Sequence, residues 1–167
     1  MKRLCILPCA ALLVTAVSSG RLVAADWPQL QCDPAHTGYT ADQPNPPYRL
    51  LWCRDLKEPM ATASQPVIAA GRMYVGTNYG NLYALDRGTG ETSWTYRTGR
   101  PILGSAAFDG GTVYVNSMDH RCHAVDARTG ERRWAFETGE GIWAAPVIAD
   151  GKVFVAGRDG SVYALDA

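Results

Sequence analysis

The sequence carries no excess of charge, and this excludes one large class of partners. Sixteen Lys and Arg residues face sixteen Asp and Glu residues in a chain of 167. Removal of the first 25 residues, which include three of the basic side chains, would leave a net charge of −3. Nucleic-acid binding depends on clustered Lys and Arg side chains that neutralise phosphates. We therefore expect no nucleic-acid partner, and the 47% of hydrophobic residues predicts a globular protein.

The sequence also lacks the short motifs of common enzyme chemistry. It contains no G-x-S-x-G element, no Gly-rich phosphate loop and no nucleophile paired with a base. Residue types that bind metals cluster at His120, Cys122 and His123. On a strand, His120 and Cys122 share one face and His123 points to the other, so the three do not converge on one ion. We expect no catalytic residue and no metal site.

Beyond its first residues, the chain has no long apolar run. The exception is Leu4–Val17, which is too short to span a bilayer comfortably. It follows Lys2 and Arg3, and it precedes Val23-Ala24-Ala25, where small residues suit signal peptidase. We predict a signal peptide over residues 1–25 and an exported protein, periplasmic or extracellular. An N-terminal membrane anchor is the alternative.

Cysteine is scarce once the signal peptide is removed, because three remain of the five. In an oxidising compartment, Cys32 and Cys53 are the plausible disulfide, since they flank a segment with no repeat pattern. Three buried free thiols are the alternative. Cys122 stands where the repeat described next has Leu82 and Val162, which indicates a small core residue.

What the sequence does contain is a repeat of forty residues. The stretch ALDRGTGETSW at Ala84–Trp94 returns as AVDARTGERRW at Ala124–Trp134, and ALDA begins a third copy at Ala164. Gly71, Gly111 and Gly151 keep the same step. A strand-rich repeat of this length, punctuated by glycine, is typical of a propeller blade. The predicted fold is all-β: a partial β-propeller with about two full four-stranded blades and an incomplete third.

The repeat divides the chain. Residues 26–47 are rich in proline and predicted to be irregular. Tyr48–Leu56 is predicted to be a fourth strand without its blade, because Trp52 takes the position of the repeat's tryptophan. The blades are predicted at 65–104, 105–144 and 145–167, the last lacking its fourth strand, with 48–64 as orphan strand and loop. The strands expected in the first blade are Gln65–Ala69, Arg72–Gly76, Asn81–Asp86 and Glu91–Arg97.

Both full copies match A-x-D-x-x-T-G-E-x-x-W, and in this they resemble the tryptophan-docking motif of PQQ-like (quinoprotein-type) propellers. That superfamily holds quinoprotein dehydrogenases and also the non-enzymatic periplasmic scaffold of outer-membrane β-barrel assembly. The opening DWPQLQCDPAHTGY is similar to secreted PQQ-like repeat proteins. The resemblance implies that the motif docks neighbouring blades. The implied docking residues are Trp52, Trp94, Trp134, Asp86, Asp126, Gly90 and Gly130.

The resemblance does not by itself imply the cofactor. The dehydrogenases carry a catalytic Asp, acidic and amide ligands for calcium, a Trp under the quinone and, in many, adjacent cysteines. This chain has no adjacent pair, and Asp86, Asp126 and Asp166 belong to the turn motif. We expect neither PQQ nor calcium to bind this chain alone. The function predicted is a binding or scaffolding module; part of a quinoprotein dehydrogenase, with its active site in missing blades, is the alternative.

The predicted binding surface is the loop face, where the loops after the second and fourth strands of each blade open on the same side. Trp143 is the strongest candidate there for contact with a protein or small ligand, because its counterpart in the previous repeat is Leu103. An ordinary polar rim is the alternative. The residues expected on this face are Arg100, Asp119, His120, Glu140, Trp143, Arg158 and Asp159.

Three blades are fewer than the four to eight of typical closed propellers. Either the chain is a fragment completed by another polypeptide, or two copies close head to tail, each lending Tyr48–Leu56 to the other's third blade. We favour the fragment.

Overall fold

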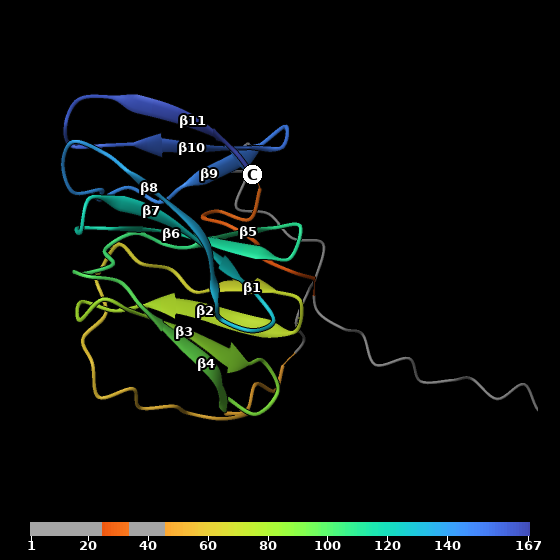
Figure 1. The fold of residues 1–167 in the computed structure, drawn as a ribbon. Coiled ribbons are helices and arrows are strands. Elements are labelled where there is room, and N and C mark those ends of the chain that lie inside the picture. The colour runs from red at the N-terminus through yellow and green to blue at the C-terminus, as the bar shows by residue number, and fades with distance from the viewer. Residues whose placement is uncertain (1–24, 34–45) are drawn as a thin grey trace, which may run out of the picture.

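The computed structural model describes residues 25–33 and 46–167, and within these ranges the elements are all strands (Figure 1). They form three antiparallel sheets stacked one after another, each corresponding to one predicted blade. Blade 1 consists of β1 (Val67–Ala69), β2 (Arg72–Gly76), β3 (Asn81–Asp86) and β4 (Thr92–Arg97). Blade 2 consists of β5 (Ala107–Asp109), β6 (Thr112–Ser117), β7 (Arg121–Asp126) and β8 (Arg132–Glu137). Blade 3 consists of β9 (Val147–Ala149), β10 (Lys152–Ala156) and β11 (Val162–Asp166). The prediction of a partial propeller is confirmed.

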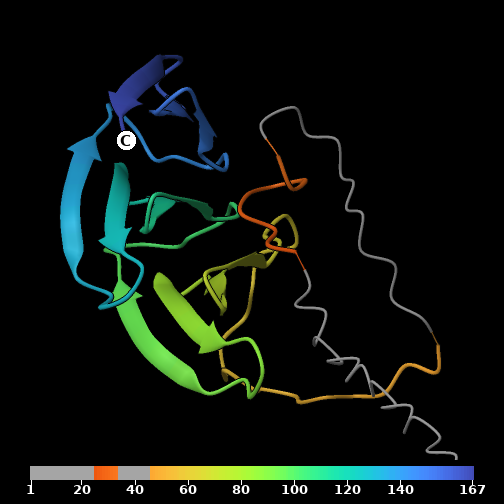
Figure 2. The ribbon, with the colours of Figure 1, turned by 90° about the vertical axis from the view of Figure 1, so that its right-hand side faces the viewer.

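The two complete blades share one register. Ala84 lies opposite Trp94 in blade 1, and Ala124 lies opposite Trp134 in blade 2. Each of these pairs is followed by a register shift at the next residue of the third strand. Figure 2 shows the blades as an arc, with β4 and β8 along its outer side and the short first strands toward its centre.

The turn between the third and fourth strands is built by the repeated motif. Asp86 Oδ1 accepts hydrogen bonds from the backbone N–H groups of Gly88 and Thr89, both at 2.9 Å. Gly90 ends the turn at φ = +73°, a conformation that favours glycine. The same arrangement recurs at Asp126 and Gly130, where φ is +77°. The Trp52 ring lies against Gly90, and the Trp94 ring of β4 lies against Gly130. At Gly130 the motif therefore makes both a turn and a contact between blades.

The core lies between blades. Tyr74, Leu82 and Ala84 of blade 1 are buried together with Val113 and Val115 of blade 2. Forty residues further on, the equivalent residues of blade 2 are buried with blade 3; these are Tyr114, Cys122, Ala124, Val153 and Val155. One face of each sheet therefore packs on the opposite face of the next, and burial of these side chains is the main stabilising contribution.

The segment 25–33 has no regular structure, and it crosses the first strands of all three blades. Trp27 exchanges two backbone hydrogen bonds with Ile68 of β1, at 2.6 and 2.8 Å. The Pro28 carbonyl accepts from Phe108 of β5 at 2.7 Å, and Gln29 Oε1 accepts from the Ile148 N–H of β9 at 3.3 Å. Trp27, Pro28 and Gln29 thus each form a hydrogen bond with the first strand of a different blade.

The predicted strand Tyr48–Leu56 is wrong, because the structure has no strand there. Trp52 nevertheless makes the same kind of hydrogen bond as the docking tryptophan Trp94. Its Nε1–H donates to the Arg87 carbonyl at 3.0 Å, as Trp94 Nε1–H donates to Ala127 at 3.0 Å. A fourth strand needs the third strand of its own blade as a partner, and the described residues place none beside this segment.

The disulfide prediction is also wrong: Cys32 and Cys53 are both free thiols in the structure. Cys32 follows the segment that crosses the first strands, whereas Cys53 follows Trp52, which lies on the turn after β3. The two cysteines are therefore attached to different sides of the arc. The predicted signal peptide lies outside the described residues, apart from Ala25. Within the ranges that are described, no helix is long and apolar enough to cross a membrane.

Candidate functional site

The loop face forms where the loop after one blade's fourth strand meets the loop after the next blade's second strand. The N–H of Gly99 donates to Asp119 Oδ2 at 2.8 Å, and the N–H of Gly139 donates to Asp159 Oδ2 at 2.7 Å. Because each bond joins consecutive blades, the two kinds of loop do open on the same side of the arc. The bonds also fix the spacing of the loops along that side.

Asp119 and Asp159 are directed into the fold, not toward a ligand. Asp119 also contacts His123 Nε2 at 3.1 Å, and its side chain is only 9% exposed. Burial alone would raise the pKa of Asp119, but the hydrogen bonds from His123 and Gly99 lower it to about 2. Asp159 accepts from the Tyr163 hydroxyl at 2.6 Å. The hydrogen-bonding capacity of both carboxylates is largely used within the fold.

In blade 1, Glu58 supplies the carboxylate that Asp119 and Asp159 supply in the other blades, and this was not predicted from the sequence. Tyr79 stands where the other blades have Asp119 and Asp159, so the loop of blade 1 has no carboxylate of its own. Glu58 supplies one from the preceding segment and accepts from the hydroxyls of Thr77 at 2.6 Å and Tyr83 at 2.8 Å. Burial would raise its pKa, but these bonds and one from Asn81 lower it. The sequence signal for this contact was Tyr83, because Tyr163 has an acidic residue four positions before it, Asp159, and Tyr83 does not.

Three further predicted residues lie on the loop face with their backbones engaged. Thr138 Oγ1 donates to the carbonyls of His120 at 3.0 Å and Glu140 at 2.6 Å. Thr98 Oγ1 donates to the Arg100 carbonyl at 2.7 Å in the equivalent loop. Arg100 and Glu140 are exposed residues, whereas His120 is half-buried. The φ of His120 is +70°. These loops are held by hydrogen bonds and present charged groups to solvent.

Trp143 is the distinctive feature of this face. It is 60% exposed, and the guanidinium carbon of Arg158 lies 5.9 Å from the centroid of its ring. Such a cation–π contact contributes about 0.5–1 kcal/mol at an exposed site. Leu103, its counterpart in the previous repeat, is half-buried. Two of the seven side chains that the sequence placed on this face, Trp143 and Arg158, therefore lie together.

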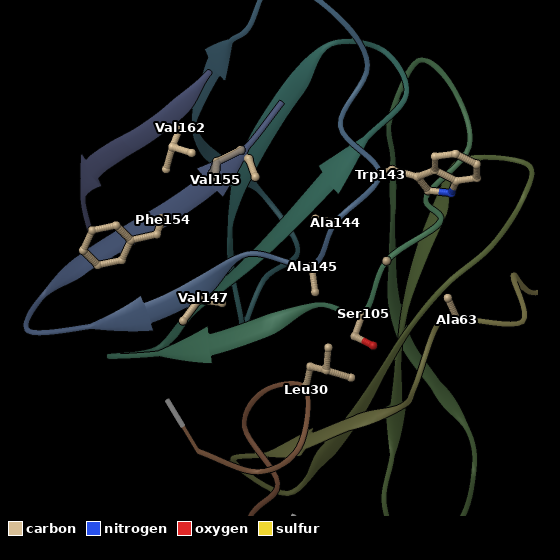
Figure 3. Close-up of a pocket in the computed structure, with 12 residues that line it drawn as sticks. Leu30, Ala63, Ser105, Trp143, Ala144, Ala145, Val147, Phe154, Val155 and Val162 are labelled. Atoms are coloured by element: carbon tan, nitrogen blue, oxygen red, sulfur yellow. The ribbon is translucent and has the colours of Figure 1, made fainter. Parts of the chain in front are cut away.

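Trp143 borders a cavity of about 470 Å³ with a largely apolar lining. Figure 3 shows Trp143 on one side of the hollow, Phe154 and Val162 on the other, and Ser105 between them. Leu30 approaches from the N-terminal segment. The cavity therefore collects side chains from blade 3, from the loops that join the blades and from the segment that crosses their first strands. Apolar walls with few polar groups suit an apolar side chain or ring.

The described residues bring no cluster of acidic side chains together for a calcium ion. Among the described residues, no group of three His, Cys, Asp or Glu side chains could hold a metal ion. The carboxylates of Asp86 and Asp126 accept backbone hydrogen bonds in turns, and Asp119 is paired with His123. Burial raises the pKa of the Cys122 thiol to about 12, so this thiol is no nucleophile at neutral pH.

Comparison with known proteins gives a consistent family. A family model described as outer membrane protein assembly factor BamB matches residues 46–106 and 98–167. The quinohemoprotein alcohol dehydrogenase of Comamonas testosteroni is 34% identical over 76 residues, covering 42% of this chain and 11% of that protein. Its crystal structure aligns with a TM-score of 0.74 at 30% identity, over 85% of this chain and 25% of the other.

BamB from Moraxella catarrhalis aligns with a TM-score of 0.56 at 29% identity, over 62% of this chain and 33% of the other. The chain thus spans a third or less of the length of these relatives. They include an enzyme and an assembly factor, so the likeness alone does not separate the two functions. From the matched motifs, the blade geometry and these comparisons, the chain belongs to the PQQ-like propeller-repeat family described as outer membrane protein assembly factor BamB.

Proposed function

We propose that this chain is an exported propeller module that binds a segment of another protein at Trp143, without catalysis of its own. The observation that carries the proposal is the exposed Trp143 ring, which stands beside Arg158 at the edge of the apolar cavity. Trp and Arg are the residues most enriched where binding energy concentrates at protein interfaces. An aromatic ring beside an open apolar hollow has much area left to bury.

The charges around the cavity indicate what such a segment carries. Arg158 lies beside the Trp143 ring at the edge of the cavity, while the carboxylates of Asp119 and Asp159 are engaged within the fold. An apolar or aromatic side chain would enter the cavity, and an acidic group beside it would face Arg158. Export is supported by the residue pattern of the first 25 positions, and the periplasm or the extracellular space is the proposed location.

A displayed library of random twelve-residue peptides, selected on the immobilised chain, tests this proposal. We expect enriched peptides with an aromatic or aliphatic residue next to Asp or Glu. Their binding should fall at least tenfold with Trp143→Ala, because the ring is lost from the edge of the cavity. Tyr79→Ala is the matched control, since Tyr79 is an equally exposed aromatic residue on the same face of blade 1.

Enriched peptides that bind Trp143→Ala and Tyr79→Ala as tightly as they bind the wild type would reject the proposed surface. So would a selection that yields no binder at all.

The second candidate is a part of a quinoprotein dehydrogenase, which the match to the Comamonas testosteroni enzyme favours. The active site of such an enzyme would lie in other blades, and retention of PQQ and calcium by this chain would mean that it contributes to that site. We propose instead that it binds neither, because the carboxylates of Asp86, Asp126 and Asp119 accept hydrogen bonds within the fold. Added PQQ and calcium should elute apart from the protein on gel filtration. Quinone absorbance that stays with the protein would favour the dehydrogenase.

A further inference from the structure

The third strand of each blade carries a polar ring at one equivalent position, and in blade 2 this ring is an imidazole. Tyr83 of β3 and Tyr163 of β11 stand where β7 has His123. The Tyr163 hydroxyl donates to Asp159 Oδ2 at 2.6 Å, and His123 Nε2 lies 3.1 Å from Asp119 Oδ2. A tyrosine hydroxyl has one proton to donate, whereas an imidazole has a second nitrogen that also forms hydrogen bonds. His123 therefore needs a second partner, which Tyr163 does not.

The second nitrogen of His123 has its partner in the neighbouring blade. His123 Nδ1 lies 2.9 Å from the hydroxyl of Tyr96, in β4 of blade 1, and the two rings meet at 63° with centroids 5.6 Å apart. In the next interface, Phe136 of β8 meets Tyr163 at 60° with centroids 5.2 Å apart. Phe136 has no hydroxyl, and the proton of Tyr163 is already donated to its own blade. The two interfaces thus share one geometry but carry different matched pairs, Tyr with His and Phe with Tyr.

The neighbouring groups determine which nitrogen of His123 carries the proton. Burial would raise the pKa of Asp119, but the hydrogen bonds from His123 and Gly99 lower it to about 2, so its carboxylate only accepts at neutral pH. Burial raises the pKa of the Tyr96 hydroxyl, which therefore keeps its proton. Nε2 of the neutral ring then donates to Asp119, and Nδ1 accepts from Tyr96. His123 is only 3% exposed, so solvent could not readily replace a lost partner.

Apolar packing distinguishes the blades poorly, because the repeats bury the same residue types. The interface between blades 1 and 2 buries Val113 and Val115 of blade 2. The next interface buries Val153 and Val155, at the equivalent positions of blade 3. Similar units of this kind can pack on the wrong neighbour during folding, within one chain or between chains. Blade order therefore has to be specified by side chains that differ between the interfaces.

We infer that Tyr96 and His123 form a specificity pair that matches blade 1 to blade 2 and disfavours the wrong neighbours. If blade 1 packed on blade 3, Tyr96 would meet Tyr163 and its hydroxyl would lose the imidazole acceptor. If blade 2 packed on the blade 2 of another chain, Phe136 would leave His123 Nδ1 unpaired. A buried polar group without a partner destabilises the state that contains it, so only the native order satisfies both rings.

The inference is independent of the proposed function, because it uses neither Trp143 nor the cavity beside it. It is also independent of the number of blades in the complete protein. Both interfaces lie between blades that the structure describes, and both pairs of rings are in contact there.

The first test is the free energy of unfolding of three variants of the full chain, measured by urea denaturation. Tyr96→Phe and His123→Tyr each build one of the mismatched pairs in place, whereas the double variant rebuilds the pair found between blades 2 and 3. Each single variant should lower the ratio of folded to unfolded protein at least about fivefold. The double variant should be more stable than either single variant. Tyr79→Phe, which removes the same hydroxyl from an exposed ring, should leave the ratio unchanged.

The second test is the tautomer of His123, measured by nitrogen NMR of the protein with isotope-labelled histidine. The His123 signals are those that disappear in His123→Tyr. We expect the proton on Nε2 at neutral pH, and an Nδ1 signal that shifts in Tyr96→Phe and not in Tyr79→Phe. A proton on Nδ1, single variants as stable as the wild type, or a double variant no more stable than the weaker single variant would each overturn the inference.

Discussion

Replacing Gly130 with Ala should destabilise the protein more than the backbone conformation of that residue explains. Gly130 ends the turn of blade 2 at φ = +77°, and a Cβ built there would lie 2.7 Å from Cδ2 and 2.8 Å from Cγ of Trp94. Atoms at that distance must move apart. The Trp94 ring is held by its hydrogen bond to the Ala127 carbonyl and by packing against Tyr74, so it has little room to shift.

Gly111 supplies the control, because it has nearly the same φ in the same blade. Its φ is +79°, and the nearest atom to an added Cβ is the end of the Arg133 side chain at 3.9 Å. Gly111→Ala therefore measures the conformational cost alone, which is about 1–2 kcal/mol for a non-glycine residue in this region. Gly130→Ala adds the overpacking of a half-buried contact with the Trp94 ring, and overpacking of a well-packed site typically costs about 1–3 kcal/mol. The expected difference between the variants is this second contribution.

Urea denaturation, followed by tryptophan fluorescence and by circular dichroism, measures the free energy of unfolding of both variants. Gly130→Ala should also change the emission of the native state, since the substitution displaces the Trp94 ring. Equal losses of stability in the two variants, with native fluorescence unchanged, would refute the reasoning. The tryptophan would then contribute no specific contact between the blades.

Three further predictions concern single polar groups. Because the pKa of Asp119 is lowered, its contribution to stability is fully present above pH 3.8 and is lost as the pH falls toward about 2. Asp119→Asn should therefore flatten the pH dependence of the urea unfolding midpoint over that interval. An unchanged dependence would contradict this. Glu58→Ala should cost roughly 1–3 kcal/mol and speed proteolysis within residues 46–60, whereas Asp55→Ala, at an exposed position, should do neither. Iodoacetamide should alkylate the exposed Cys53 of the native protein and leave Cys122 unmodified until the chain unfolds, as mass spectrometry of the peptides would show.

The forty-residue step was sufficient to predict most of the fold. The strand predicted at Gln65–Ala69 begins at Val67, and the one predicted at Glu91–Arg97 begins at Thr92. Turn chemistry explains this accuracy, because the glycines and the aspartates of the motif are local signals that repeat. The prediction of Tyr48–Leu56 as a strand used the same pattern and was wrong, since a strand exists only where a neighbour pairs with it.

The contacts that the sequence could not predict are those made across the arc. Nothing near Gln29 in the chain indicates that its side chain reaches Ile148, 119 residues away. Glu58 was overlooked because it replaces an acid that other blades carry within the loop itself. Asp119 and Asp159 were expected on a ligand surface, but hydrogen bonds from the loop after the preceding blade's fourth strand keep them within the fold. Trp143 stood out from sequence because the preceding repeat has Leu103 at that position.

The claim that Trp143 marks a protein-binding surface is tested most directly by placing benzoylphenylalanine at position 143 in cells that produce the protein. After irradiation, the account predicts a cross-linked adduct of defined mass, containing this chain and one other polypeptide. The same probe at Tyr79, an aromatic residue of similar exposure on the loop face of blade 1, should give no such adduct. No adduct from position 143, or the same adducts from both positions, would contradict the account.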